Sequence, residues 1–466
     1  MTNNGPTFAT SRQFQTACQI VRRLRERGHA AYLAGGCVRD LLLGRPPADY
    51  DVATSATPQV VLDLFPRTFA VGASFGVVLV ATELPGADGG AEEIVTEVAT
   101  FRSDGAYSDG RRPDSVRYTQ SAEQDVRRRD FTINGMLLDP ARLAPGGDVS
   151  SAVLDYVGGR EDLHARRIRA IGDPSRRFAE DRLRMLRAVR FAARLGFSIE
   201  HATLQAIQTA AGGIEQVSRE RVREELTRML TEGAARRALE LLDRTGLLRF
   251  ALPEVARLRG VEQPPQYHPE GDVWTHTLML LEQLPAGCSA TLAWGALLHD
   301  IGKPATFRRA PDRIRFDGHV EVGVRIAEEI CQRLRMSNAE TEQIAALVAN
   351  HMRFGDVRKM RASTLKRFFR LAQFQEHLEL HRMDCLASHG DLTLYEFARR
   401  QYADSAPEAL RPRPLLNGRD LIALGYPPGP AFQPMLTLAE DAQLEGSIHS
   451  REEAIALIER NFPRPA

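Results

Sequence analysis

The segment LAGGCVRDLLLGRPPADYDVAT, residues 33–54, decides the fold of the N-terminal part. It holds the end of an expected strand (31–34), a Gly35–Gly36 turn, a short helical run, and a strand-like run with Asp49 and Asp51. Small residues at such a turn let backbone N–H groups approach an anion, and the helix that follows adds its dipole. The same turn also occurs as a plain tight connection, so alone it leaves both interpretations open.

Three carboxylates are candidate metal ligands. Asp49 and Asp51 are two residues apart, which puts both on one face of a strand. Such a pair is either a solvated strand end or a pair of ligands that share a cation. Glu97, in the acidic run EIVTEVATF, would add a third carboxylate from a neighbouring strand. Oxygen ligands suit Mg²⁺, and two such ions would support in-line phosphoryl transfer. We therefore predict Asp49, Asp51 and Glu97 as catalytic Mg²⁺ ligands.

The pattern of elements changes near residue 159. Before it, strand-like runs alternate with helical segments, which predicts an α/β domain around one sheet. After it the pattern is helical, with a proline-rich linker at 260–271 and a second break at 405–414. The Gly-, Ser- and Asp-rich stretch Arg102–Val116 predicts a mobile loop. The expected strands of the first part are 31–34, 50–54, 75–81, 94–101 and 153–156.

Composition excludes several classes of protein. The chain has 466 residues, of which 61 are basic and 60 acidic. Its net charge therefore does not indicate a nucleic-acid partner. Its five cysteines are far apart, which argues against a disulfide framework and favours a reducing compartment. No signal peptide or membrane-length apolar run is evident. We expect a soluble, cytoplasmic protein without membrane contact, and nothing indicates a protein partner.

A local arginine excess points to an anion. Residues 160–194 hold eleven arginines and five acidic residues, and unpaired arginines in such excess are costly unless an anion binds. In EDRLRMLRAVRF (180–191), Asp181 and Arg184 are three apart on an expected helix. An Asp acceptor beside an Arg donor matches the amino group and ring nitrogen of cytosine and adenine, but not of guanine or uracil. The alternative is a surface ladder of weak ion pairs.

Six motifs occur here in the order typical of one family. They are GGCVRDLLLG, the Asp49/Asp51 pair, RRRDFTINGM (127–136), LDYVGGREDL (154–163), EDRLRMLRAVRF and SRERVREEL (218–226). Over at least residues 30–230, the chain resembles the class II tRNA nucleotidyltransferase/poly(A) polymerase family. The resemblance implies a polymerase-β-like mixed-sheet head and a helical neck and body that hold tRNA. It also implies ATP and CTP as substrates and Mg²⁺ as cofactor.

The resemblance also implies roles for individual residues. Gly35, Gly36 and Arg39 would contact the triphosphate, and Arg129 and Asp130 the ribose and phosphates. Asp181 and Arg184 would read the base, with Arg187 and Arg190 lining the nucleotide pocket. Two departures, Gly135 after TIN and Arg182 after Asp181, remove no functional group. The loop Arg102–Val116 is shortened in CC-only members but is intact here, which favours A addition.

A second group of residues lies in the helical half. His276, the adjacent His299–Asp300 in ALLHDIGK, and Asp384 resemble in order the H…HD…D motif of the HD phosphohydrolase superfamily. Imidazole and carboxylate together suit a divalent transition metal. By this resemblance Lys303 would contact a phosphate, and His319 and His351 would serve a second metal or grip a phosphate. The sequence does not decide whether this domain hydrolyses phosphoesters or is catalytically degenerate.

These patterns give four predicted parts: a catalytic head (1–158), a helical neck and body that bind nucleotide and RNA (159–261), an HD domain (262–400) and a helical tail (401–466). We predict a template-independent nucleotidyltransferase that adds CCA to tRNA 3′ ends. A poly(A) polymerase or an A-adding enzyme shares the motifs and is the first alternative. An HD phosphohydrolase whose N-terminal half merely binds RNA is the second.

Overall fold

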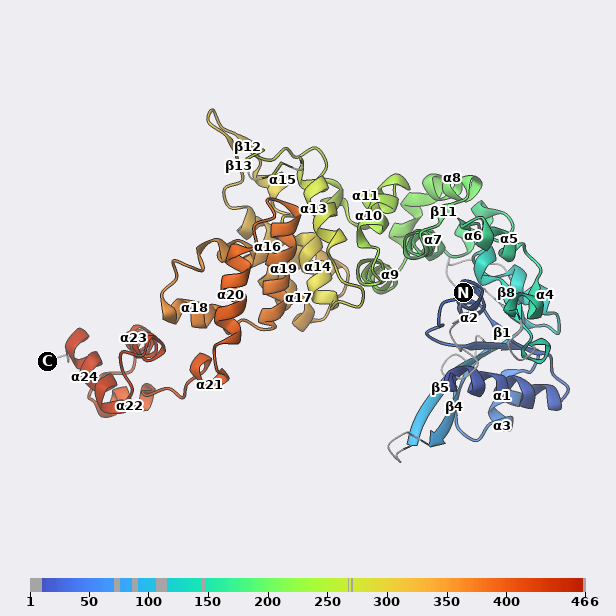
Figure 1. Ribbon diagram of the computed structural model, residues 1–466, viewed down its shortest axis with the longest axis horizontal. Helices are drawn as coiled ribbons and strands as arrows, with labels where there is room; N and C mark the ends of the chain where they lie inside the picture. Colours follow the sequence, from blue (N-terminus) through green and yellow to red (C-terminus); the bar gives the residue numbers. More distant parts are fainter. Residues whose placement is uncertain are drawn as a thin grey trace, which may run out of the picture. The chain divides into compact units, whose positions relative to one another are not determined.

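The computed structural model describes residues 11–70, 76–85, 91–105, 115–143, 148–266, 268–269 and 271–463 (Figure 1). The chain divides into two compact units. The first is Met1–Met229 with Arg237–Ala251, and the second is Leu230–Arg236 with Leu252–Ala466. The four predicted parts are a finer division than these two units, and their boundaries stay a prediction.

The first unit is built on a seven-stranded sheet with the order β3-β4-β5-β2-β1-β8-β9. β2 pairs parallel with β5 and antiparallel with β1, so the sheet is mixed, as predicted. Helix α1 (Arg12–Glu26) buries Phe14, Ile20 and Leu24. The strands are β1 (Ala31–Ala34), β2 (Asp51–Thr54), β3 (Thr68–Phe69), β4 (Val77–Pro85), β5 (Ala91–Thr100), β8 (Met136–Leu138) and β9 (Val153–Asp155).

Strand register positions the predicted site. Ala34, the last residue of β1, pairs with Asp51, the first of β2. Val52 pairs with Val98 across the parallel ladder, so Asp51 and Glu97 each precede a paired residue on neighbouring strands. Gly35 then leads directly into α2 (Gly36–Leu42). The glycine turn and two of the carboxylates therefore meet at one end of the sheet.

The predicted loop Arg102–Val116 begins and ends in paired strands. β6 (Arg102–Asp104) is antiparallel to β7 (Val116–Tyr118). Residues 106–114 lie outside the described residues.

The rest of the first unit is helical. The prediction of one continuous helix through Asp181 is wrong. Asp181 has extended backbone (φ −144°, ψ 105°), and its side chain accepts a hydrogen bond from the Leu183 N–H at 3.1 Å. Aspartate favours such joints because its carboxylate satisfies N–H groups at a helix start. Around it lie α4 (Ala122–Arg127), α5 (Gly159–His164), α6 (Pro174–Glu180), α7 (Leu183–Leu195), α8 (His201–Ala210), α9 (Arg219–Thr231) and α10 (Ala235–Arg244).

The second unit is almost entirely helical. A Cβ at Gly302 would lie 2.0 Å from the His319 carbonyl oxygen, so only glycine lets the start of α15 (Lys303–Thr306) approach the start of α16. The principal helices are α13 (Val273–Glu282), α14 (Ala290–Leu298), α16 (His319–Arg333), α17 (Asn338–Asn350), α18 (Ala362–Phe369), α19 (Phe374–Ala387) and α20 (Thr393–Ala403). Between α14 and α16 a hairpin forms from β12 (Arg308–Arg309) and β13 (Ile314–Arg315).

Three C-terminal helices, α22 (Gly418–Ala423), α23 (Phe432–Glu445) and α24 (Arg451–Asn461), close around a core of their own that includes Leu421 and Ile458. None of the helices in the described part of the chain has both the length and the apolar character that a membrane crossing requires.

Candidate functional site

Two of the three predicted magnesium ligands, Asp51 and Glu97, lie on the neighbouring strands β2 and β5, and Asp49 lies just before β2. Burial, the Glu97 carboxylate and the Asp49 carboxylate raise the pKa of Asp51 to about 7, although Arg129 opposes them. Partial loss of hydration and the Asp49 carboxylate likewise raise the pKa of Glu97. Within the described residues, the groups whose ligand atoms all lie within 4.8 Å of one another do not include this trio. The carboxylates therefore repel one another through space without closing into a tight cage.

Arg129 and Gly35 border these carboxylates. Gly35 has φ +76°, and a Cβ there would lie 3.4 Å from Arg129 Nη1 and 4.0 Å from Asp51 Oδ2. A side chain would thus be strained and would intrude between the cation and the carboxylate. Arg129 donates to Asp125 Oδ2 at 3.0 Å, and Arg128 pairs with Asp125 Oδ1 at 2.7 Å. Asp125 is 1% exposed, and despite burial the two arginines hold its pKa below the usual value.

Arg39 is buried and already coordinated by protein groups. Its guanidinium donates to both oxygens of Asp40 at 2.8 and 2.9 Å and to Asn134 Oδ1 at 2.7 Å. It also lies over the Phe191 ring, 5.5 Å from the centroid. In this structure Arg39 fixes α2 against the TIN segment, so a phosphate would have to share or replace these partners.

Asp130 joins the arginine run to α7. Arg187 pairs with Asp130 Oδ2 at 2.8 Å, while the Phe131 N–H donates to Oδ1 at 2.8 Å. Burial opposes ionisation, but Arg187 and then Arg184 keep the pKa of Asp130 below its ordinary value. One carboxylate thus orients the side chain that the resemblance assigns to the nucleotide pocket.

The predicted base-reading residues each have another partner. Asp181 receives two hydrogen bonds from Arg221 of α9, at 2.8 and 3.3 Å. Arg184 donates to Glu180 at 2.8 Å, to the Arg177 carbonyl at 3.2 Å and to the Arg128 carbonyl at 3.2 Å. A carboxylate offers about four acceptor positions and a guanidinium five donors, so both retain capacity for a base.

Carboxylates pair the arginines of α7, contrary to the expectation that they lack partners. Arg190, 4% exposed, donates to Glu225 of α9 at 2.6 Å, and Arg187 lies 3.8 Å from the same residue. The expectation of unpaired arginines was wrong because it counted only the acidic residues within 160–194. The partners Asp130 and Glu225 come from outside that segment. The arginines therefore form an internal network rather than an uncompensated patch.

Sequence reasoning missed four residues of this network: Glu180, Arg221, Glu225 and Asn134. Arg221 and Glu225 lie four apart in SRERVREEL, so they share one face of α9. That spacing is a usable signal, because it lets the cation pair with Asp181, just before α7, and the anion pair with Arg190, on α7. Nothing in the spacing, however, identifies which partners they take.

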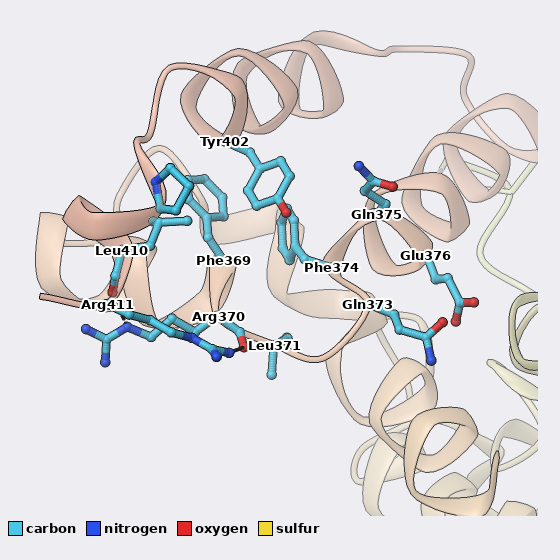
Figure 2. Close-up of a pocket in the computed structure, with 11 residues that line it drawn as sticks. Phe369, Arg370, Leu371, Gln373, Phe374, Gln375, Glu376, Tyr402, Leu410 and Arg411 are labelled. Atoms are coloured by element: carbon cyan, nitrogen blue, oxygen red, sulfur yellow. Dashed lines mark hydrogen bonds between the residues drawn. The ribbon is translucent and has the colours of Figure 1, made fainter. Parts of the chain in front are cut away.

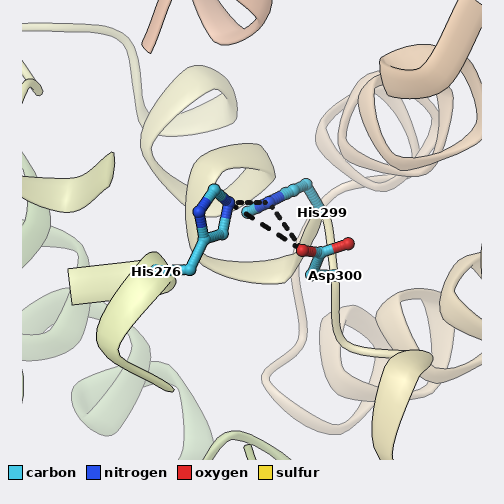
Figure 3. Close-up of side chains that lie close together, drawn as sticks. All are labelled: His276, His299 and Asp300. Carbon is cyan, nitrogen blue, oxygen red and sulfur yellow. Dashed lines mark hydrogen bonds and ion pairs between the residues drawn. The ribbon is translucent and has the colours of Figure 1, made fainter. Parts of the chain in front are cut away.

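In the second unit, the predicted HD residues converge. Figure 3 shows His276, His299 and Asp300, whose ligand atoms all lie within 4.8 Å of one another. His276 Nε2 is 3.3 Å from His299 Nε2 and 3.1 Å from Asp384 Oδ1. Burial opposes it, but the hydrogen bond with His276 holds the pKa of Asp384 well below its usual range. All four predicted ligands thus come together from α13, the end of α14 and α19.

Asp300 also faces a second group, formed with His319 and His351. Asp300 Oδ1 and the Nε2 atoms of both histidines are buried and have no hydrogen-bond partner. The Nδ1 atoms of His319 and His351 lie 2.9 and 2.7 Å from backbone carbonyls, which fixes the proton on Nδ1. Burial lowers the pKa of His351 to about 4, so its Nε2 lone pair is available at neutral pH. Three orphaned acceptors around one point fit a cation.

Lys303, predicted to contact a phosphate, is 6% exposed, and its ammonium group already contacts other protein side chains. Its ammonium lies 2.7 Å from Asp300 Oδ2 and donates to Gln263 Oε1 at 2.6 Å. It thereby neutralises part of the charge on Asp300.

A separate cavity of about 560 Å³ lies near α18, α19 and α20 (Figure 2). Phe369, Phe374 and Tyr402 line it and pack against one another, with 4.8 Å between the centroids of Phe374 and Tyr402. The Arg370 guanidinium on its rim is held by the Leu410 carbonyl and Glu440. No residue predicted from the sequence lines this cavity, and we assign it no chemistry.

Three segments of the chain match known family models. Residues 31–169 match the family model of the Poly A polymerase head domain. Residues 196–258 match a probable RNA and SrmB-binding site of polymerase A. Residues 272–384 match the HD domain.

Full-length similarity decides the family. The CCA-adding enzyme of Geobacillus sp. (strain WCH70) is 33% identical over 459 residues, which cover 97% of this chain and 98% of that protein. The chain belongs to the family of CCA-adding enzymes. It is therefore a nucleotidyltransferase. Similarity to another CCA-adding enzyme, from Geobacillus thermodenitrificans (strain NG80-2), is higher but shorter: 44% over 243 residues, about half (55%) of that protein's length.

A solved structure of the family also resembles this chain along its length. The Bacillus stearothermophilus CCA-adding enzyme in complex with CTP aligns with a TM-score of 0.70 and 29% identity. The alignment covers 97% of this chain and 98% of that one. The predicted fold, a mixed-sheet head followed by helical parts and an HD domain, is confirmed.

The raised pKa of Asp51 predicts opposite effects of Asp51→Asn on stability and on metal binding. The folded-state pKa of about 7 exceeds the unfolded value, so the stability of the metal-free protein is highest below the unfolded pKa and falls as pH rises through 7. Asparagine does not ionise, so Asp51→Asn removes this pH-dependent loss of stability. At pH 8 with chelator, we expect Asp51→Asn to be more stable than the parent by on the order of 2 kcal/mol, and less so at pH 5.

Thermal melts with and without Mg²⁺ measure both effects. If Asp51 binds Mg²⁺ as predicted, saturating Mg²⁺ should stabilise the parent more than the variant, which lacks this carboxylate. Asp63→Asn, a change at an acid on helix α3 (Pro58–Leu64), is the matched control. A variant that is less stable than the parent at pH 8 in chelator would show that the carboxylates do not repel one another.

Proposed function

We propose that the N-terminal unit adds C, C and A to the 3′ end of tRNA, using CTP and ATP. Membership in the family of CCA-adding enzymes supports this, as does the CTP bound to the similar B. stearothermophilus enzyme. The observation that carries the proposal is the mutual repulsion of three carboxylates beside Arg129, one residue from the Asp130–Arg187 pair. A cation between the carboxylates would relieve this repulsion, and an anionic nucleotide would add to the existing contacts of the arginines.

Asp49, Asp51 and Glu97 would hold Mg²⁺, and the donor set fits because all three ligands are carboxylate oxygens. When bound, two such ions would lower the pKa of the attacking 3′-hydroxyl and offset charge on the leaving pyrophosphate. Arg129 is placed to contact a phosphate while it remains anchored on Asp125. Gly35 keeps the approach to Asp51 open. Asp130 would orient Arg187 and accept from a ribose hydroxyl.

Base selection is proposed for Asp181 and Arg184. Asp181 would accept from the amino group shared by cytosine and adenine, and Arg184 would donate to the ring nitrogen. Arg221 holds Asp181 from the segment that matches the RNA-binding model, and Glu180 holds Arg184. The reading pair is therefore fixed by protein partners and needs no nucleic-acid template.

A primer-extension assay tests the function. Purified protein with Mg²⁺, CTP and ATP is given tRNA without CCA, tRNA that ends in CC, and an unrelated oligo(A). We expect C, C, A on the first, a single A on the second, and then a stop, with one pyrophosphate released per nucleotide. A tails on every RNA would identify a poly(A) polymerase, and extension of only the CC-ended tRNA an A-adding enzyme. Absence of both extension and pyrophosphate would leave only an RNA-binding role.

Replacing Asp181 tests base selection. Asp181→Ala removes the acceptor for the amino group, so we expect incorporation of G and U to rise relative to C and A by about ten-fold. The exposed acid Glu224 on α9 supplies the control Glu224→Ala, which should keep the selectivity of the parent. Competition among the four nucleotides on tRNA without CCA measures the ratio. An equal loss with all four would refute the reading role.

We also propose that the protein is cytoplasmic. The location is supported by five free cysteines, as in a reducing compartment.

A second proposal is that the second unit is a metal-dependent phosphohydrolase. The three orphaned buried acceptors favour the phosphohydrolase. His276, His299, Asp300 and Asp384 would hold one transition metal, with Asp300, His319 and His351 around a second. A metal bound there would polarise a phosphoester and activate water.

Asp300→Asn separates the two proposed activities. Asp300 faces both metal groups, so its replacement should reduce metal uptake and abolish hydrolysis of bis(p-nitrophenyl) phosphate, while CCA addition continues. Metal content is measured by elemental analysis after loading with Mn²⁺. The control is Asp317→Asn, at an exposed acid beside the same site. Hydrolysis that survives in Asp300→Asn would place the activity elsewhere.

A further inference from the structure

The linker that precedes the HD motif is hydrogen-bonded to the elements that carry the HD residues. We call residues 260–266 the linker strap. The Gly260 N–H donates to Asp272 Oδ2 at 2.7 Å, and the Val273 N–H donates to the Val261 carbonyl at 3.0 Å, which ties the strap to the start of α13. Glu262 pairs with Arg309 of β12 at 2.6 Å. The strap is thus held at both sides, although it lies outside the segment that matches the HD domain.

One strap side chain enters the interior of the second unit. Gln263 is 4% exposed, and its Oε1 accepts from Lys303 Nζ at 2.6 Å. Because an ammonium only donates, the amide oxygen must face Lys303, and the amide nitrogen faces elsewhere. That nitrogen, Nε2, is buried and has no hydrogen-bond partner. Lys303 in turn contacts Asp300 Oδ2 at 2.7 Å, so the amide lies two polar contacts from Asp300.

The unpartnered atoms at the two ends of the Gln263–Lys303–Asp300 chain of contacts are of two kinds. Asp300 Oδ1 and the Nε2 atoms of His319 and His351 are acceptors, and a cation satisfies them. Gln263 Nε2 is a donor, and a cation cannot satisfy it. A buried donor without a partner costs free energy comparable to a lost hydrogen bond, so it indicates an acceptor that arrives with a ligand.

We infer that Gln263 is a substrate-positioning residue of the HD site, and that its amide N–H binds a phosphoryl oxygen of the phosphoester. The amide oxygen holds Lys303 beside Asp300, while the nitrogen would donate to a phosphoryl oxygen of the bound phosphoester. The inference rests on the phosphohydrolase proposed above and adds to it a residue outside the HD motif. Lys303 and Gln263 thus act as a pair, one carrying charge and the other a directional donor.

Gln263→Met tests the inference, because methionine has similar length and neither donates nor accepts strongly. The strap offers a matched control, Gln266→Met, at an exposed position. Both are made in an Asp49→Ala/Asp51→Ala background of the full chain, so that the head does not contribute metal. The variants are loaded with Mn²⁺, and binding of inorganic phosphate is measured by titration calorimetry. A second variant, Gln263→Glu, keeps an acceptor for Lys303 but loses the donor.

We expect both Gln263 variants to bind phosphate about ten-fold or more weakly than the parent, with unchanged Mn²⁺ content, and Gln266→Met to match the parent. Phosphate affinity within two-fold of the parent in Gln263→Met would overturn the inference and leave the phosphohydrolase standing. Loss of Mn²⁺ together with a lower melting temperature would overturn it in favour of a structural role. A parent that takes up no Mn²⁺ would overturn the inference and the phosphohydrolase together.

Discussion

The buried carboxylate of Asp125 is the constraint on which the first site depends. It is 1% exposed and pairs with the side chains of Arg128 and Arg129 at once, directly before Asp130 in the chain. The Arg128 carbonyl accepts from Arg184, the Arg129 side chain faces the carboxylates, and Asp130 binds Arg187. One short segment therefore links the proposed metal ligands to the proposed base-reading helix. A shift at Asp125 would be transmitted to both, since each contact involves a neighbouring residue.

The second unit uses the opposite arrangement. There a single carboxylate, Asp300, faces histidines on two sides and an ammonium on a third. Burial opposes ionisation, yet Lys303 and His299 keep its pKa well below the ordinary value. Backbone carbonyls fix the protons of His319 and His351 on Nδ1, so their Nε2 lone pairs face Asp300. The first site is arginine-rich and suited to phosphates of a nucleotide, whereas the second is imidazole-rich and suited to a transition metal.

The sequence predicted what depends on local order and missed what depends on distant partners. Strands β1 and β2, the Gly35 turn and the HD adjacency follow from spacing within a few residues, and the structure has them. Three-residue spacing predicts a helix at Asp181 because it ignores the hydrogen bond by which this carboxylate caps the start of α7. The partners of Arg187, Arg221 and Arg190 lie 57, 40 and 35 residues away. No periodicity encodes such pairs, and Gln263 was read only as part of a linker.

These distant pairs change the meaning of the charge balance. The eleven arginines and five acidic residues of segment 160–194 predict an anion that compensates the arginines, but α7 finds its carboxylates within the fold. Removing one partner of a buried ion pair costs more free energy than replacing both partners by apolar residues, because the remaining charge stays desolvated. A nucleotide must therefore add to the arginine contacts rather than replace them. Arg184 and Asp181, which keep unused donors and acceptors, are the members that can do so without breaking a pair.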